Sequence, residues 1–205
     1  MKRNSIFSAA LAALLLIAPA ATAQTQSMAA YESVTAENSR MWVEGTSTIH
    51  DWECPVNDFT AQIRAAADGE DGEMLASIGR ISVTAAVESI ECEKGKMNRK
   101  LRDALLSDDF PDVTFEAESA EITASEAGPT AYAVGTLTMA GETRDLSVSA
   151  TISRTDDGRI LLTGRAPIVL TSFGIDPPTA LLGTLKTGDE VFVRFEVVLG
   201  EQQAN

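Results

Sequence analysis

The sequence predicts an all-β protein built from about eight antiparallel strands and one short helix. Apolar residues recur at every second position in segment after segment, which is typical of strands with one buried face. Short turns rich in Gly and Asp separate most of these segments, so neighbouring strands should pair antiparallel. One stretch of the chain, residues 96–112, has a helical period instead.

The N-terminal segment is predicted to be a secretory signal peptide covering residues 1–23. Lys2 and Arg3 precede an apolar run over residues 9–18, and Ala21-Thr22-Ala23 supplies a cleavage site. The run is shorter than the roughly 20 residues a membrane span needs, and no later stretch approaches that length. We therefore expect one domain over residues 24–205, located in the periplasm or secreted, and not embedded in a membrane.

Eight strands are expected in the mature chain, each with one face more apolar than the other. Their predicted ranges are 40–48, 59–64, 81–88, 113–118, 132–139, 146–153, 160–170 and 190–200. Such strands must either close into a barrel or fold into two packed sheets. The inward positions are rich in Ala and Val and the chain is only 5% aromatic, which favours a barrel with room for a ligand.

The helix is expected after the third of these strands. Met97, Leu101, Ala104 and Leu105 share one stripe, and Pro111 ends the segment. Its charged residues are interpreted as a solvated face on a helix that flanks the β-core.

Net charge excludes nucleic acid as a partner. The chain carries −14 at neutral pH, and removal of Lys2 and Arg3 with the signal peptide makes the mature protein more acidic still. A phosphate backbone requires a basic surface, which the composition does not provide.

The two cysteines, Cys54 and Cys92, are predicted to form a disulfide, because both lie in the exported part of the chain. The alternative is that both are reduced and buried. Metal binding would need further ligands that the single histidine, His50, cannot supply, so neither a metal nor a cofactor is expected.

Residues 47–54, with the sequence STIHDWEC, gather the only histidine, a tryptophan and a cysteine. A catalytic triad is not favoured here, because Asp51 adjoins His50 and neighbouring strand residues point to opposite faces. No other catalytic motif is present, so an enzyme is not expected. We interpret the segment as a strand leaving the barrel at its rim, with His50 polar and Trp52 covering apolar surface. If titration of His50 tunes ligand binding, H50A will change the affinity profile across about pH 5 to 8.

Four stretches resemble the YceI family, a bacterial periplasmic family of lipid- or polyisoprenoid-binding domains. They are WVEGTSTIHDWEC (42–54), MNRKLRDALLSDDFPDVTFEAES (97–119), VGTLTMAGETRDLSVSATI (134–152) and SFGIDPPTALLGTLKTGDEVFVRFEVVL (172–199). The resemblance implies an eight-stranded, lipocalin-like β-barrel with an elongated apolar lumen. The His-Asp-Trp-Glu-Cys run departs from the family's usual opening, so the chain is similar to a cysteine-bearing branch.

The function implied by this resemblance is sequestration or carriage of an isoprenoid or other amphiphilic long-chain lipid, such as a quinone or a polyprenyl lipid. The residues expected to line the lumen are Val83, Val87, Phe115, Val134, Val148, Ile168, Val193, Phe195 and Val197; the alternative for each is ordinary core packing without ligand contact. The rival function is a non-enzymatic structural or interaction module of the cell envelope. An outer-membrane barrel is disfavoured because the strands lack aromatic girdles. The sequence leaves the oligomeric state open, a homodimer included.

Overall fold

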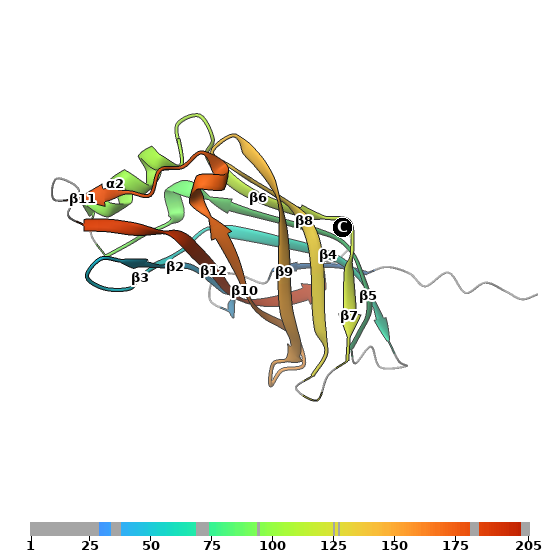
Figure 1. The fold of residues 1–205 in the computed structure, drawn as a ribbon. Coiled ribbons are helices and arrows are strands. Elements are labelled where there is room, and N and C mark those ends of the chain that lie inside the picture. The colour runs from blue at the N-terminus through green and yellow to red at the C-terminus, as the bar shows by residue number, and fades with distance from the viewer. Residues whose placement is uncertain are drawn as a thin grey trace, which may run out of the picture.

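The computed structural model describes residues 29–33, 38–68, 74–93, 95–124, 126, 128–180 and 185–201 (Figure 1). The predicted signal peptide, residues 1–23, lies outside the described residues. The strands are β1 (Ala29–Ser33), β2 (Arg40–Ser47), β3 (Trp52–Pro55), β4 (Phe59–Asp68), β5 (Met74–Ala86), β6 (Asp112–Ala117), β7 (Ala120–Thr123), β8 (Thr130–Met139), β9 (Glu142–Arg154), β10 (Ile160–Val169), β11 (Thr179–Ala180) and β12 (Leu185–Glu201). The helices are α2 (Gly95–Ala104) and the 3-10 turns η1 (Val87–Ser89) and η2 (Leu170–Phe173).

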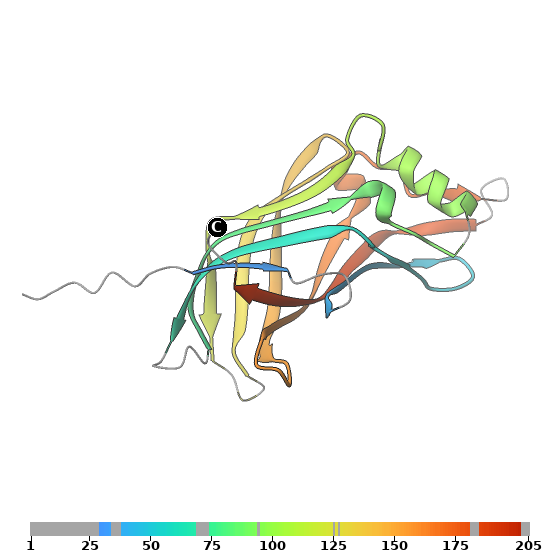
Figure 2. The same cartoon turned by 180° about the vertical axis from the view of Figure 1, so that it is seen from behind.

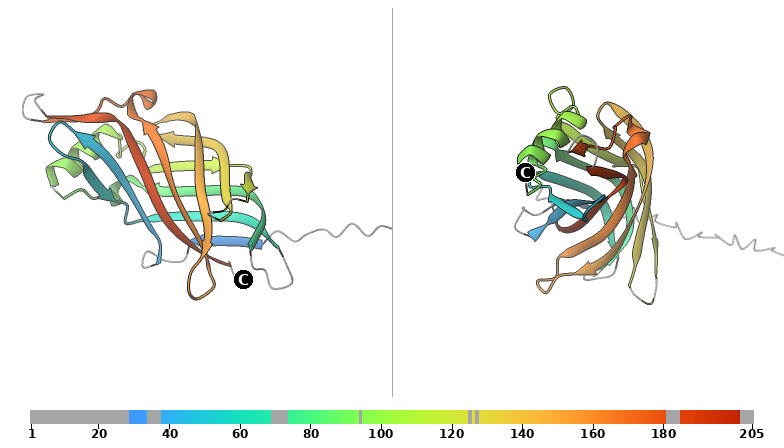
Figure 3. Two further views of the ribbon diagram at one scale, coloured as in Figure 1. Left: turned by 60° about the horizontal axis from the view of Figure 1, so that its bottom comes forward. Right: turned by 60° about the vertical axis from the view of Figure 1, so that its left-hand side comes forward.

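Eight of these strands close into an antiparallel barrel. Hydrogen bonding runs in the order β1-β4-β5-β6-β8-β9-β10-β12, and β12 pairs in turn with β1. The sheet therefore curls back on itself, as the turned views show (Figures 2 and 3). All eight segments predicted from alternation contain strands, and the sheet forms a barrel rather than a pair of packed sheets. Seven of the predicted strands belong to the barrel; the predicted segment 40–48 is β2, which pairs with β12 beside it, and the barrel strand β1 was not predicted.

Strands β6 and β7 share one position in the barrel wall. β6 pairs with β5 and with β8, and β7 pairs with the same two neighbours further along. The two behave as one strand interrupted at Glu118 and Ser119. An interruption of this kind lets a strongly curved wall change direction.

The long strand β12 divides one of its edges between two partners. Residues Thr187 to Glu196 pair with β2, whereas Leu199 to Glu201 pair with β1. Ser39 bridges the junction, because its hydroxyl accepts a hydrogen bond from Val198 N–H at 3.0 Å and lies 3.4 Å from Val198 O, to which it donates. Ser39 is buried, so this side chain supplies the ladder bonds that neither strand makes at that point.

Helix α2 lies at one end of the barrel, beside the β2–β3 hairpin and the start of β12 (Figures 1 and 2). Met97, Leu101 and Ala104 form its apolar stripe, as predicted, and pack against the core while remaining partly exposed. Leu105, just beyond the helix, is buried. The helix thus covers part of the barrel end without being enclosed by it.

Candidate functional site

A cavity of about 1510 Å³ occupies the barrel. Its wall comes from the inward faces of the strands, where alternation places an apolar side chain at every second position. Representative lining residues are Ile63 of β4, Val83 of β5, Phe115 of β6, Leu137 of β8, Val148 of β9, Ile168 of β10 and Val193 of β12. Several lining positions hold only alanine, among them Ala61, Ala131, Ala133, Ala150 and Ala166, and these small side chains leave the space open.

Packed side chains close one end of the cavity. Ala65, Ile152, Ile160 and Leu199 are buried in one hydrophobic cluster and do not line the cavity. Leu199 is among the most deeply buried side chains of the described residues, with 1% exposure. The cavity therefore ends at a plug of side chains here.

The opposite end is open to solvent, because lining residues there are exposed. We call this set the entrance: Thr46, Ile49, His50, Asp51, Glu53, Pro55, Glu93, Lys96, Lys100, Thr179 and Lys186. The β2–β3 hairpin, α2 with the segment before it, and the β11–β12 pair contribute these residues. Most entrance residues are polar and the interior is apolar. The cavity is therefore complementary to a molecule with a polar head and an apolar chain.

The tip of the β2–β3 hairpin holds its shape through a local hydrogen-bond set. The Ser47 hydroxyl donates to His50 O at 2.7 Å, and Ser47 N–H donates to the same oxygen at 3.0 Å. The His50 ring nitrogen Nδ1 lies 2.8 Å from Asp51 O. These groups stabilise a turn, so the serine and the histidine are not arranged as a nucleophile and its base.

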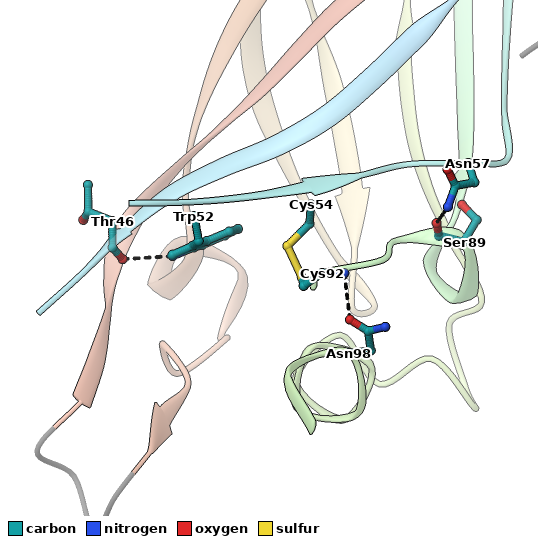
Figure 4. Close-up of a disulfide and its surroundings, with 7 residues drawn as sticks. All are labelled: Thr46, Trp52, Cys54, Asn57, Ser89, Cys92 and Asn98. Atoms are coloured by element: carbon teal, nitrogen blue, oxygen red, sulfur yellow. Dashed lines mark hydrogen bonds between the residues drawn. A yellow bond between two sulfur atoms is a disulfide. The ribbon is translucent and has the colours of Figure 1, made fainter. Parts of the chain in front are cut away.

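Trp52 packs across the hairpin onto Gly45. The indole Nε1 donates to Thr46 O at 3.0 Å (Figure 4). A Cβ placed on Gly45 would lie 2.2 Å from the ring. Only glycine therefore permits this close approach. Trp52 and His50 both line the cavity, and His50 belongs to the entrance.

Cys54 and Cys92 form a disulfide, as predicted, and it ties β3 to the segment that precedes α2 (Figure 4). Cys92 N–H donates to Asn98 Oδ1 of the helix at 2.7 Å, and a single β-bridge joins Val56 to Ile90 beside the disulfide. Beyond β2, β3 pairs with no other named strand among the described residues. The disulfide therefore joins the hairpin and the helix at the side of the entrance where the ladder is interrupted.

Glu44 organises a charged cluster where β2, β10 and β12 lie side by side. Its carboxylate accepts hydrogen bonds from Arg194 Nη1 at 2.8 Å and Trp42 Nε1 at 3.0 Å, and Arg165 Nε lies 3.8 Å away. Partial burial acts to raise the pKa of Glu44, but the hydrogen bonds and the two guanidinium charges outweigh it and hold the pKa below its ordinary value. These contacts link β2, β10 and β12 to one another near the entrance.

The structure brings together most of the residues predicted to line the lumen. Seven of them border the cavity: Val83, Phe115, Val148, Ile168, Val193, Phe195 and Val197. Val87 is buried in η1 and does not border it. The prediction for Val134 is wrong, because its side chain is 57% exposed on the outer face of β8. In this strand the odd-numbered residues Ala131, Ala133 and Leu137 face inward.

The alanines of the wall, the entrance lysines and Met41 of β2 also line the cavity and were not predicted from the sequence. The alanines carried a usable signal, since Ala131, Ala133, Leu137 and Met139 fall on one face of a strand. No group of three or more His, Cys, Asp or Glu side chains suited to a metal ion occurs in the described parts of the chain. No helix in those parts is long and apolar enough to cross a membrane.

An antiparallel barrel around an apolar cavity with one polar entrance defines a lipocalin-like barrel. The chain belongs to the YceI-like family, since the profile of the YceI-like domain matches residues 31–199.

Solved structures share this fold. BcnA of Burkholderia cenocepacia is 19% identical, with a TM-score of 0.63 over 80% of this chain and 98% of that chain. A polyisoprenoid-binding domain of Saccharophagus degradans is 11% identical, with a TM-score of 0.59 over 86% and 100% of the two chains. The YceI protein of Campylobacter jejuni is 20% identical, with a TM-score of 0.52 over 73% and 84%. No curated protein gives a significant sequence match.

Proposed function

We propose that this protein binds an isoprenoid or another long-chain amphiphilic lipid in the barrel cavity and carries or sequesters it in the periplasm. One observation carries the proposal: the cavity of about 1510 Å³ is apolar inside, plugged at one end and polar at the other. This volume exceeds the range of about 300–1,000 Å³ that is usual for drug-sized ligands. It suits a long flexible chain whose polar head stays at the entrance.

Energetics support a chain of several isoprene units. A unit has five carbons, and burial at about 0.8 kcal/mol per CH₂ contributes roughly 4 kcal/mol. Association costs about 4 to 15 kcal/mol, while micromolar affinity needs a net value of about −8 kcal/mol. Several units must therefore enter the cavity together. The residues proposed to contact the chain are those of the inward faces, such as Phe115, Val148 and Phe195.

Two further observations support the proposal. The structural neighbour from Saccharophagus degradans is described as a polyisoprenoid-binding domain, and it has the same fold. The disulfide is typical of an oxidising compartment, which agrees with export directed by the predicted signal peptide. The proposal assigns no catalytic role to the chain, because Ser47 and His50 are both committed to the hairpin turn.

Mass spectrometry of the purified protein tests the proposal. Protein released by osmotic shock without detergent is extracted with an apolar solvent, and we expect a polyprenyl or quinone lipid in the extract. Delipidated protein that remains folded by circular dichroism but takes up neither geranylgeraniol nor a long-chain quinone would overturn the proposal and favour an interaction module without a small ligand.

A matched pair of variants on β9 localises the uptake. V148N places an amide in the cavity wall, and S147N places the same amide on the exposed face of the strand. An unpaired buried amide costs about 1–3 kcal/mol, so geranylgeraniol should bind V148N roughly 5- to 150-fold more weakly than S147N. Equal affinities would place the ligand outside the barrel.

A further inference from the structure

The described lysines gather at the cavity entrance. Lys96, Lys100 and Lys186 all line the cavity, and none forms an ion pair among the described residues. Most described arginines, in contrast, form ion pairs with carboxylates. These are Arg40, Arg80, Arg102, Arg144, Arg159, Arg165 and Arg194. The entrance therefore carries cationic groups that no neighbouring carboxylate neutralises directly.

The fold brings lysines from two distant segments together. Lys96 and Lys100 are one turn apart on α2, beside the apolar stripe that faces the cavity. Lys100 Nζ donates a hydrogen bond to the carbonyl oxygen of Thr179 in β11. Thr179 is the register partner of Lys186 in β12, so the ammonium of Lys100 and the backbone of Lys186 flank the same residue.

Helix α2 is a basic segment on an acidic molecule. It carries Lys96, Arg99, Lys100 and Arg102 against a single acidic residue, Asp103, while the chain as a whole carries −14. Arg102 is neutralised by Glu88 at 3.0 Å, whereas Arg99 is exposed and forms no ion pair with a described residue. The acidic residues of the entrance, Asp51, Glu53 and Glu93, come from the hairpin and the segment before the helix. The charge of the surface thus changes sign locally at α2.

An exposed apolar side chain lies at the same opening. Ile49 at the hairpin tip is 66% exposed, more than any other large hydrophobic residue that the structure describes. A lone exposed isoleucine is ordinary on a protein surface. Beside three lysines at the opening of an apolar cavity, however, it matches the composition of surfaces that insert into a lipid headgroup layer.

We propose that the entrance is a docking surface for an anionic phospholipid bilayer. Lys96, Arg99, Lys100 and Lys186 contact lipid phosphates, and Ile49 enters the boundary between head groups and acyl chains. The basic residues of α2 attract this end of the molecule to the lipid phosphates, and Asp51, Glu53 and Glu93 in the rest of the entrance oppose that attraction. A hydrocarbon chain then passes between bilayer and cavity without crossing water.

Near a bilayer surface, the charges on α2 and Lys186 affect binding more than the net charge of the whole protein does. Salt screens charges beyond a Debye length of about 8–10 Å at physiological ionic strength, so carboxylates on other faces have little effect on a docked helix. A Lys or Arg near an anionic leaflet contributes about 1 kcal/mol. Removing two such charges should therefore weaken vesicle binding roughly 30-fold.

Vesicle co-sedimentation with the purified mature protein tests the docking surface. We expect binding to vesicles of phosphatidylethanolamine and phosphatidylglycerol, little binding to pure phosphatidylcholine vesicles, and a decline with rising salt. The double variant K96Q/K100Q should bind the anionic vesicles about 30-fold more weakly, and I49S should also bind more weakly. The control is R64Q/R159Q, which removes the same charge beside the plug residues Ala65 and Ile160; Arg159 forms an ion pair with Asp157 at 2.8 Å.

Several results would overturn this proposal. They are equal binding to both kinds of vesicle, no binding to the anionic ones, or equal losses for K96Q/K100Q and its control. Loss of vesicle binding on addition of soluble glycerol phosphate at constant ionic strength would assign the lysines to a head group held in the entrance instead. Uptake of geranylgeraniol from ethanol, measured in parallel, reports on the proposed lipid binding separately, because docking can fail while the cavity still fills.

Discussion

Replacing a small lining residue with a large one tests directly whether the ligand occupies the barrel interior. Ala133 faces the cavity from β8 and Val134, the next residue, is on the outer face. A133F projects a phenyl ring into the space, whereas V134F adds the same ring to the outside of the same strand. Both variants add a phenyl ring to β8, and they differ mainly in whether the ring lies on the inner or the outer face of the strand.

The expected loss of affinity follows from the hydrocarbon displaced. A phenyl ring has about as many carbons as one isoprene unit, so A133F should exclude roughly one unit from the cavity. At about 0.8 kcal/mol per CH₂ this is roughly 4 kcal/mol, or close to three orders of magnitude in Kd if the chain cannot shift. V134F should leave Kd unchanged within a factor of about two.

The assay is titration of delipidated protein with geranylgeraniol, followed by quenching of tryptophan fluorescence. Trp52 lines the cavity and provides the signal. Thermal unfolding of each variant shows that the barrel still forms. If A133F is folded and binds as tightly as the wild type, or if V134F weakens binding to the same extent, the ligand does not occupy the barrel interior.

Four further outcomes follow from individual contacts. Replacing Cys54 and Cys92 with alanine should lower the free energy of unfolding by about 4 kcal/mol for a closed loop with a separation of 38 residues; an unchanged urea midpoint would contradict this. S39A removes both bonds to Val198 and should cost about 1–3 kcal/mol in the same measurement, whereas S147A removes only the exposed bond from the Tyr132 hydroxyl at 3.0 Å and should cost less than S39A. G45A should displace the Trp52 ring and shift its fluorescence spectrum, and an unaltered spectrum would show that the ring does not need the glycine. Because the folded-state pKa of Glu44 is lowered, its contribution to stability is present above the unfolded value of about 4.3 and is lost as pH falls through the folded pKa. E44Q should therefore show a shallower loss of stability on acidification than the wild type, as followed by urea midpoints, and identical pH profiles would contradict that role.

Alternation predicted the strands well because each wall strand separates an apolar interior from water. β12 shows this most clearly, since its odd-numbered residues from Val191 to Val197 line the cavity. In β8 the same reasoning chose the wrong face. Val134 is more hydrophobic than Ala133, but the interior there requires small side chains, so hydrophobicity and inward orientation do not coincide.

Other features were not accessible because they depend on contacts between distant segments. β1, β3, β7 and β11 are too short for a period to be recognised, and their pairing partners define them. The entrance joins Lys100 to Thr179, which no local pattern connects. The disulfide was predictable because the chain has only two cysteines and the predicted signal peptide directs them to an oxidising compartment.

The division of β12 between β2 and β1 has a consequence for how the chain reaches its folded state. Ser39 and Val198 are separated by 159 residues, and the N-terminal strand finds its second neighbour only in residues 199 to 201. During synthesis, β1, β2 and β10 each keep one edge unpaired until the C-terminal strand has emerged. Such a half-built wall is prone to pair with other chains, so the interval before closure is when this protein most needs a chaperone.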